Sequence, residues 1–292
     1  MERILLIGAG GQLGTDLRRA LPADQLVPLT RAELDITDPE ATERVLADHR
    51  PAWVVNTSAF HRVDDIETKY ARQAFALNAV AVDDLARACA RRNVRLLHLS
   101  TDYVFGAGLP GPYTEDAVPA PSSIYGLSKL AGEHLIRQAS PDHVIVRSSG
   151  LYGVAGSSGK GGNFVETMLR LAKANKDIQV VDDQVLSPTY AEDLALAITR
   201  LIAIHPPGGI FHLTNAGECS WFRFAQEIFR IAKLTPRLEP TTSEKYRDRA
   251  PAPRPSYSVL VNTRTAALGL APLRPWPEAL AAYLRAKGHR AD

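Results

Sequence analysis

The 292-residue sequence has little cysteine, little net charge and no long apolar run. Its two cysteines, Cys89 and Cys219, lie far apart without metal or redox spacing, so we expect two buried thiols, a reducing compartment and no metal site. A formal net charge of +2 argues against a nucleic-acid surface. No apolar stretch approaches the ~20 residues that span a bilayer, and no signal peptide precedes the first expected strand. These absences predict a cytoplasmic protein that binds neither membrane nor nucleic acid.

Short apolar runs alternate with helical patterns through the first half of the chain. Buried strands are predicted at residues 3–7, 25–29, 53–56, 95–99 and 143–147. This alternation is typical of a parallel sheet with helices on both faces. We therefore predict an α/β fold, with a doubly wound Rossmann domain at 1–150 to which segments near 176–204 return. Most of 151–292 should form a smaller, interleaved substrate lobe, with a Gly/Ser/Lys-rich loop at 153–162.

A glycine-rich turn follows the first predicted strand. The string Gly8-Ala9-Gly10-Gly11-Gln12-Leu13-Gly14 leads directly into a helical pattern. Strand, glycine turn and helix together are the context of a dinucleotide site, where the backbone approaches a pyrophosphate at a helix N-terminus. The Gly8-x-x-Gly11-x-x-Gly14 spacing differs from the more common G-x-G-x-x-G, so a glycine turn without a ligand remains the alternative.

The second predicted strand bears on the choice of cofactor. Thr30 and Arg31 follow it, at the position where an acidic residue would bind an adenosine ribose 2′-hydroxyl. A threonine and an arginine suit a 2′-phosphate instead, which favours NADPH and leaves NADH possible. The alternative is an ordinary surface arginine in a turn.

The stretch from Ser100 to Lys129 carries the predicted chemistry. Ser122 and Ser123 precede an apolar-periodic run, which predicts a helix on which Tyr125 and Lys129 are an i,i+4 pair. A nearby ammonium would lower the phenol pKa and make the tyrosine a proton donor near neutral pH. Ser100-Thr101-Asp102 should lie at the carboxyl end of a buried strand, where ligands bind in open α/β sheets. A Tyr-x-x-x-Lys match alone arises often by chance.

Together with Asn78, these motifs resemble those of the extended short-chain dehydrogenases/reductases. Within that family, several strings are similar to the dTDP-4-dehydrorhamnose reductases, and they cover nearly the whole chain. Examples are Ser100-Thr101-Asp102-Tyr103-Val104-Phe105, Gly162-Asn163-Phe164-Val165 and Arg254-Pro255-x-x-Ser258-Val259-Leu260. Two strings depart from the pattern. His61-Arg62 follows the third strand, and Gly150-Leu151 stands where a tryptophan is usual, so we expect a missing wall in the sugar pocket.

The resemblance implies NADPH-dependent reduction of the 4-keto group of a nucleotide-linked deoxyhexose. The implied substrate is dTDP-4-dehydro-L-rhamnose, and a homodimer is the expected assembly. The implied catalytic residues are Tyr125 as proton donor, Lys129 and Thr101. The implied cofactor contacts are Gly8, Gly11, Gln12, Leu13, Gly14, Arg31, Asp35, Ile36, Ala59, Ser100, Tyr125 and Lys129. The implied substrate contacts are His61, Asp102, Tyr103, Asn163 and Phe164. Two alternatives stay open: a nucleotide-sugar epimerase or dehydratase, and a non-enzymatic NADP-binding regulatory subunit.

Overall fold

The computed structural model describes residues 2–106, 111–155 and 162–289. Its main sheet has six strands in the order β10-β5-β4-β3-β1-β2, and every neighbouring pair is parallel. The bounds are β1 Ile4–Ile7, β2 Leu26–Leu29, β3 Trp53–Asn56, β4 Arg95–Thr101, β5 Val144–Ser148 and β10 Gly209–His212. The strand order reverses between β1 and β3, and ligands of open α/β sheets bind beyond the carboxyl ends of strands at such a point. The predicted fold class is confirmed.

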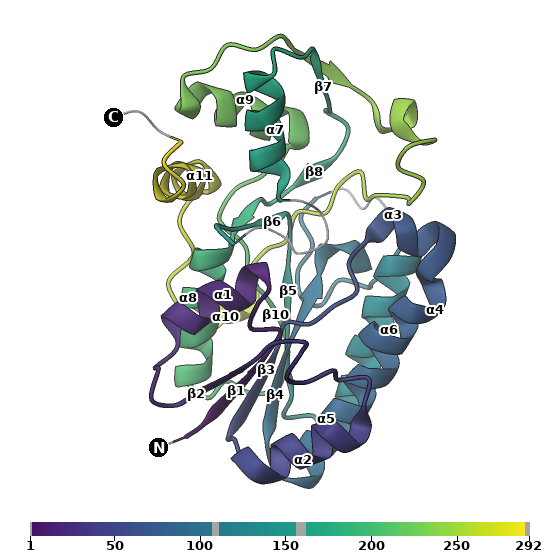
Figure 1. The fold of residues 1–292 in the computed structure, drawn as a ribbon, viewed down its shortest axis with the longest axis vertical. Helices are drawn as coiled ribbons and strands as arrows, with labels where there is room; N and C mark the ends of the chain where they lie inside the picture. The colour runs from purple at the N-terminus through teal and green to yellow at the C-terminus, as the bar shows by residue number, and fades with distance from the viewer. Residues whose placement is uncertain (1, 107–110, 156–161, 290–292) are drawn as a thin grey trace.

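Two helical layers cover the sheet (Figure 1). Helices α1 (Gln12–Ala20) and α8 (Ala191–Ala203) lie on one face, and α2 (Pro39–His49), α5 (Ala81–Arg91) and α6 (Ile124–Ala139) lie on the other. Alternate residues of β1 enter the two cores, Ile4 and Leu6 on one side and Leu5 and Ile7 on the other. Burial on both faces explains why these strands are continuous apolar runs.

Later segments form a second core above the carboxyl edge of the sheet (Figure 1). Its helices are α7 (Phe164–Lys173), α9 (Trp221–Ala232) and α11 (Trp276–Ala286). Three two-stranded sheets accompany them: β6 (Leu151–Tyr152) with β9 (Thr189–Tyr190), β7 (Ile178–Val181) with β12 (Leu238–Thr241), and β8 (Val185–Leu186) with β11 (Cys219–Ser220). Within the described ranges, no helix is long and apolar enough to cross a membrane. The boundary between the two lobes stays a prediction.

Three local features complete the fold. Helix α8 begins at Ala191, directly after β9. Asp38 caps α2 by accepting a 3.0 Å bond from the Ala41 amide, while the Thr37 hydroxyl donates to Asp35. The late strand β10 joins the main sheet beside β5. Of the predicted loop 153–162, residues 156–161 lie outside the described residues.

The helical stretch that precedes β4 contains two π-helical turns. They span Ile66–Tyr70 and Ala76–Val80, with α3 (Val63–Asp65), α4 (Ala71–Phe75) and α5 around them. Asn78 lies buried in the second turn, and its amide bonds both backbone groups of Phe60 and the Ser128 hydroxyl at 2.8–3.0 Å. Asn78 therefore ties the segment after β3 to α6.

A buried ion pair joins α6 to the sheet. Arg147 of β5 donates to both carboxylate oxygens of Glu133, with Nη2–Oε2 at 2.6 Å, and the two side chains are 1% and 2% exposed. The Ser100 hydroxyl of β4 donates to Glu133 Oε1 at 2.5 Å. One carboxylate thus fixes α6 against two neighbouring strands.

We expect Glu133→Gln to lower the free energy of unfolding by about 3 kcal/mol or more, because it leaves the buried Arg147 charge uncompensated. Asp83→Asn is the matched control, since Asp83 pairs with a half-exposed Arg87 and should matter by about 1 kcal/mol or less. Urea unfolding measures both changes. Equal losses in the two variants would contradict a fixing role for Glu133.

Candidate active site

Helix α6 presents a polar stripe to β4. Tyr125, Lys129 and Glu133 are spaced i, i+4 and i+8, so they lie on one face. The helix begins as predicted, because the Ser123 hydroxyl accepts a 3.1 Å bond from the Gly126 amide. Lys129 Nζ donates to the Leu99 carbonyl at 2.7 Å, and the Tyr125 hydroxyl is hydrogen-bonded to the Thr101 side chain. The three predicted catalytic residues therefore converge at the carboxyl end of β4.

Burial controls the protonation of these groups. It raises the pKa of Tyr125, and the hydrogen bond with Thr101 offsets only part of that rise. Burial also lowers the pKa of Lys129 to about 8, although the nearby Glu133 carboxylate opposes the shift. The predicted lowering of the tyrosine pKa by the lysine is therefore wrong for this structure, because burial dominates and the nearby Asp102 and Tyr103 also raise the pKa. The phenol keeps its proton through the neutral range, which is the form a proton donor needs.

Asp102 binds three hydroxyl groups within the protein. Its carboxylate accepts bonds from Ser149 at 2.8 Å, Ser258 at 2.7 Å and Thr101 at 3.1 Å, and it is buried. Burial raises its pKa, while these hydrogen bonds act in the opposite direction. Asp102 thus joins the ends of β4 and β5 to the C-terminal segment, and its predicted contact with a sugar stays a prediction. The neighbouring Tyr103 ring packs edge-on against Tyr125 at 5.5 Å between centroids.

The glycine turn after β1 has the close packing that a dinucleotide cradle requires. Gly8 has φ of +82°, and a Cβ on Gly14 would come within 2.2 Å of the Gly8 carbonyl oxygen. The first turn of α1 leaves backbone N–H groups without helical acceptors. Neither position tolerates a side chain: Gly14 is buried against the turn, while the backbone at the exposed Gly10 and the half-buried Gly11 stays accessible. These residues fit a bound pyrophosphate.

The predicted nucleotide-reading residues follow β2. Arg31 has an 88% exposed side chain and forms an ion pair with Asp35, with Nη2–Oδ2 at 3.4 Å. Asp35 also accepts bonds from the Thr37 amide and hydroxyl, which hold its pKa below the ordinary value. Ile36 is buried beneath this turn, whereas Ala59, after β3, is half-buried. An exposed ion pair of this kind is weak, so a phosphate can compete with Asp35 for the guanidinium, and binding of the 2′-phosphate by Arg31 stays a prediction.

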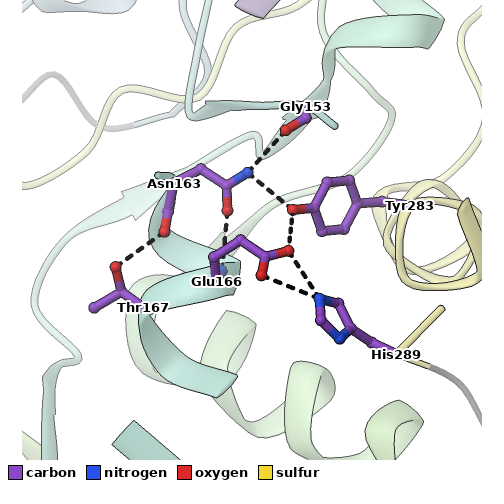
Figure 2. A network of polar contacts seen from close by, with 6 residues as sticks. All are labelled: Gly153, Asn163, Glu166, Thr167, Tyr283 and His289. Carbon is purple, nitrogen blue, oxygen red and sulfur yellow. Dashed lines mark hydrogen bonds and ion pairs between the residues drawn. The ribbon is translucent and has the colours of Figure 1, made fainter. Parts of the chain in front are cut away.

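Asn163 is part of a polar network at the start of α7 (Figure 2). Its Oδ1 caps the helix by accepting from the Glu166 amide at 3.0 Å, and its Nδ2 donates to the Gly153 carbonyl and the Tyr283 hydroxyl, each at 3.0 Å. His289 lies 3.0 Å from both Glu166 oxygens. Burial would raise the pKa of Glu166, but hydrogen bonds from Tyr283 and His289 outweigh it. The network fastens the predicted substrate residue to the C-terminal helix.

The other predicted substrate residues are more dispersed. Phe164 packs against Trp221 with the rings tilted by 48° and their centroids 4.6 Å apart, and it stacks on Phe224 at 5.8 Å. His61 is half-buried, with Nδ1 3.3 Å from the Ala59 carbonyl. Nucleotide or sugar contacts by Asn163, Phe164 and His61 therefore stay predictions.

Gly150 lies in a turn that has no room for a larger residue. Its φ is +53°, and a Cβ there would lie 2.5 Å from Leu186 Cδ1. A tryptophan at this position would need both the backbone and Leu186 to move. Tyr152, two residues on, is buried against Tyr190, Tyr283 and Phe224. The missing wall expected from Gly150-Leu151 stays a prediction.

Sequence reasoning missed the polar residues behind the stripe. Asn56, His98, Glu133 and Arg147 are all buried and bonded to one another or to the predicted residues. A signal existed for His98, which lies inside an apolar strand three residues before Thr101. A histidine in such a place needs polar partners, and the facing helix supplies them.

The sheet topology, the glycine turn and the Thr101–Tyr125–Lys129 cluster define an extended short-chain dehydrogenase/reductase. More specifically, the chain belongs to the RmlD substrate binding domain family, which matches residues 1–288. It is 41% identical to a dTDP-4-dehydrorhamnose reductase of Mycobacterium tuberculosis, over 98% of this chain and 93% of that protein. It is 43% identical to a Streptomyces antibioticus protein named probable dTDP-4,6-dihydroxy-2-methyloxan-3-one 4-ketoreductase, over 95% and 93%. A Bacillus anthracis dTDP-4-dehydrorhamnose reductase solved with NADP superimposes with a TM-score of 0.91, at 36% identity over 98% and 99% of the two chains.

We expect Arg31→Ala to weaken NADPH binding by roughly 10–100-fold while leaving NADH binding nearly unchanged, since a charge-assisted bond to the 2′-phosphate is lost. Comparing kcat/KM for the two cofactors measures this. Arg285→Ala removes an exposed arginine from α11 and serves as the control. Equal losses with NADH and NADPH would show that Arg31 does not read the 2′-phosphate.

Proposed function

We propose that this protein reduces the 4-keto group of a nucleotide-linked deoxyhexose with NADPH, and that its substrate is dTDP-4-dehydro-L-rhamnose, which becomes dTDP-L-rhamnose. The observation that carries the proposal is the convergence of Thr101, Tyr125 and Lys129 at the sheet edge that also holds the glycine turn. The names of the relatives, and the NADP in the Bacillus anthracis structure, support the sugar and cofactor.

When bound, the nicotinamide supplies the hydride. Tyr125 then gives its proton to the oxygen that becomes the alcohol, because burial keeps the phenol protonated at neutral pH. Thr101 is hydrogen-bonded to that phenol, and its hydroxyl hydrogen, which points to Asp102 in the free protein, turns to the same oxygen as negative charge develops on it. Lys129 holds the nicotinamide ribose hydroxyls. The glycine turn after β1 takes the pyrophosphate, and Arg31 takes the 2′-phosphate.

Two other functions fit less well. A dehydratase needs an acidic pair after Thr101, but Asp102-Tyr103 supplies one carboxylate, and three hydroxyl groups engage it. A regulatory NADP-binding subunit would have no use for the Thr101–Tyr125 hydrogen bond. A homodimer and a cytoplasmic location remain our expectations.

The substrate is tested with purified protein, NADPH and two 4-keto sugars, dTDP-4-dehydro-L-rhamnose and dTDP-4-keto-6-deoxy-D-glucose. We expect faster NADPH oxidation with the first, and NMR of the product should show a C4 alcohol. The proposal is contradicted if neither sugar is turned over. A preference for the second sugar would change the assigned substrate but not the assigned reaction.

Tyr125→Phe should reduce turnover roughly 10²–10⁴-fold, because it removes only the donated proton. The affinity for NADPH and the unfolding midpoint should stay close to wild type. Tyr246→Phe, which removes a hydroxyl bonded to the Gln179 carbonyl in the other lobe, controls for the loss of a phenol. Unchanged turnover in Tyr125→Phe would rule out this tyrosine as proton donor and favour the regulatory subunit.

A further inference from the structure

A chain of buried polar groups runs from β3 through β4 to the lysine of α6. Asn56 Nδ2 lies 3.1 Å from His98 Nδ1, and His98 Nε2 lies 2.9 Å from Lys129 Nζ. Asn56 and His98 are 0% exposed and Lys129 is 1% exposed. Unpaired hydrogens are costly at such depth, so the direction of each bond matters.

The orientation of the Asn56 amide is fixed by its other neighbours. The Ser58 backbone N–H and the Ser58 hydroxyl both donate to Asn56 Oδ1, at 3.0 and 2.6 Å. A backbone N–H can only donate, so the atom it faces is the amide oxygen, and Nδ2 is the atom that faces His98. The Asn56 Nδ2–H group therefore donates to His98 Nδ1. A neutral imidazole that accepts at Nδ1 carries its hydrogen on Nε2.

The hydrogen on His98 Nε2 points at Lys129. Lys129 Nζ already donates to the Leu99 carbonyl at 2.7 Å. A neutral amine can also accept the Nε2–H bond through its lone pair, but an ammonium has no acceptor. If Lys129 is an ammonium, either the Asn56–His98 contact or the His98–Lys129 contact must bring two donors together. The neutral amine is the one state in which every bond of this chain is paired.

We propose that Asn56 and His98 are positioning residues for the predicted catalytic lysine: Asn56 fixes the tautomer of His98, and that tautomer determines how readily Lys129 takes up a proton. The proposal deepens the proposed reductase function, because Lys129 is part of that site. The chain also places the Nζ atom, since the Leu99 carbonyl and the imidazole hold it from two directions.

The surrounding charges are consistent with this assignment. Glu133, one turn along α6, favours the ammonium, but Arg147 and Ser100 engage both of its oxygens. Tyr125, one turn earlier, keeps its proton and carries no charge. Burial, the larger cause, holds the pKa of His98 well below its usual range, so the imidazole is neutral.

Asn56→Asp reverses the direction of the hydrogen bonds from residue 56 through His98 to Lys129, with almost no change in side-chain shape. One carboxylate oxygen keeps both Ser58 bonds, and the other can only accept, so His98 must donate from Nδ1. Nε2 is then free to accept from an ammonium. Lys129 should hold its proton to higher pH in this variant. If ammonium is the working form, the alkaline limb of kcat/KM moves upward by about one pH unit or more.

The test begins with nitrogen-15 NMR of histidine-labelled protein, with the His98 signal identified by its loss in His98→Gln. We expect the Nε2–H tautomer in the wild type above about pH 8, where Lys129, with a pKa of about 8, is largely the neutral amine, and the Nδ1–H tautomer in Asn56→Asp. The pH profile of kcat/KM is then measured for both. Asn175→Asp, an exposed asparagine outside the site, controls for the added negative charge.

An Nδ1–H tautomer in the wild type overturns the proposal, and so does an alkaline limb that moves equally in Asn56→Asp and Asn175→Asp. If Asn56→Asp does not fold, His98→Gln replaces it. The glutamine amide can rotate to present either its oxygen or its NH₂ group to Lys129, so residue 98 no longer has to donate to the lysine. Its alkaline limb should also rise, and an unchanged limb counts against the proposal. The NMR result does not depend on turnover, so failure of the reductase assignment is seen separately.

Discussion

The site depends on one buried carboxylate, that of Glu133. The Glu133 carboxylate binds Ser100 of β4 and Arg147 of β5. These bonds fix the position of α6 along the sheet and the face that the helix turns toward the sheet. Lys129 and Tyr125 lie one and two turns earlier on the same face, so their positions follow from this anchor. A buried ion pair adds little net stability over an apolar core, but losing one partner is costly, which makes it well suited to fixing a register.

The second constraint is the low polarity behind the sheet edge. It keeps Tyr125 protonated and makes Lys129 a weak base, with a pKa of about 8. On an exposed helix, a lysine ammonium four residues from a tyrosine would instead lower the tyrosine pKa, as a charge–charge effect predicts. The pKa values of Tyr125 and Lys129 therefore depend on how α6 is packed and not on the Tyr-x-x-x-Lys motif alone.

Local signals were readable from the sequence, and long-range ones were not. The buried strands, the Ser123 cap and the tightly packed glycine turn each depend on neighbours a few residues away. The roles of Asp102, Asn163 and Gly150 depend on partners more than twenty residues away, namely Ser258, Tyr283 and Leu186. Those partners become visible only when segments far apart in the sequence are folded together. His98 was missed for the same reason, because its meaning depends on Asn56 and Lys129.

The chain passes between the two lobes more than once. The strand β4 and helix α6, which carry Thr101, Tyr125 and Lys129, are held by the sheet and by Glu133. The C-terminal segment reaches the same place through Ser258, which donates to Asp102 beside Thr101. Because α8 and β10 return to the main sheet after the chain has entered the second lobe, the first core is built from both halves of the sequence. The position of the predicted proton donor therefore depends on a core that is complete only when the later segments have folded onto it.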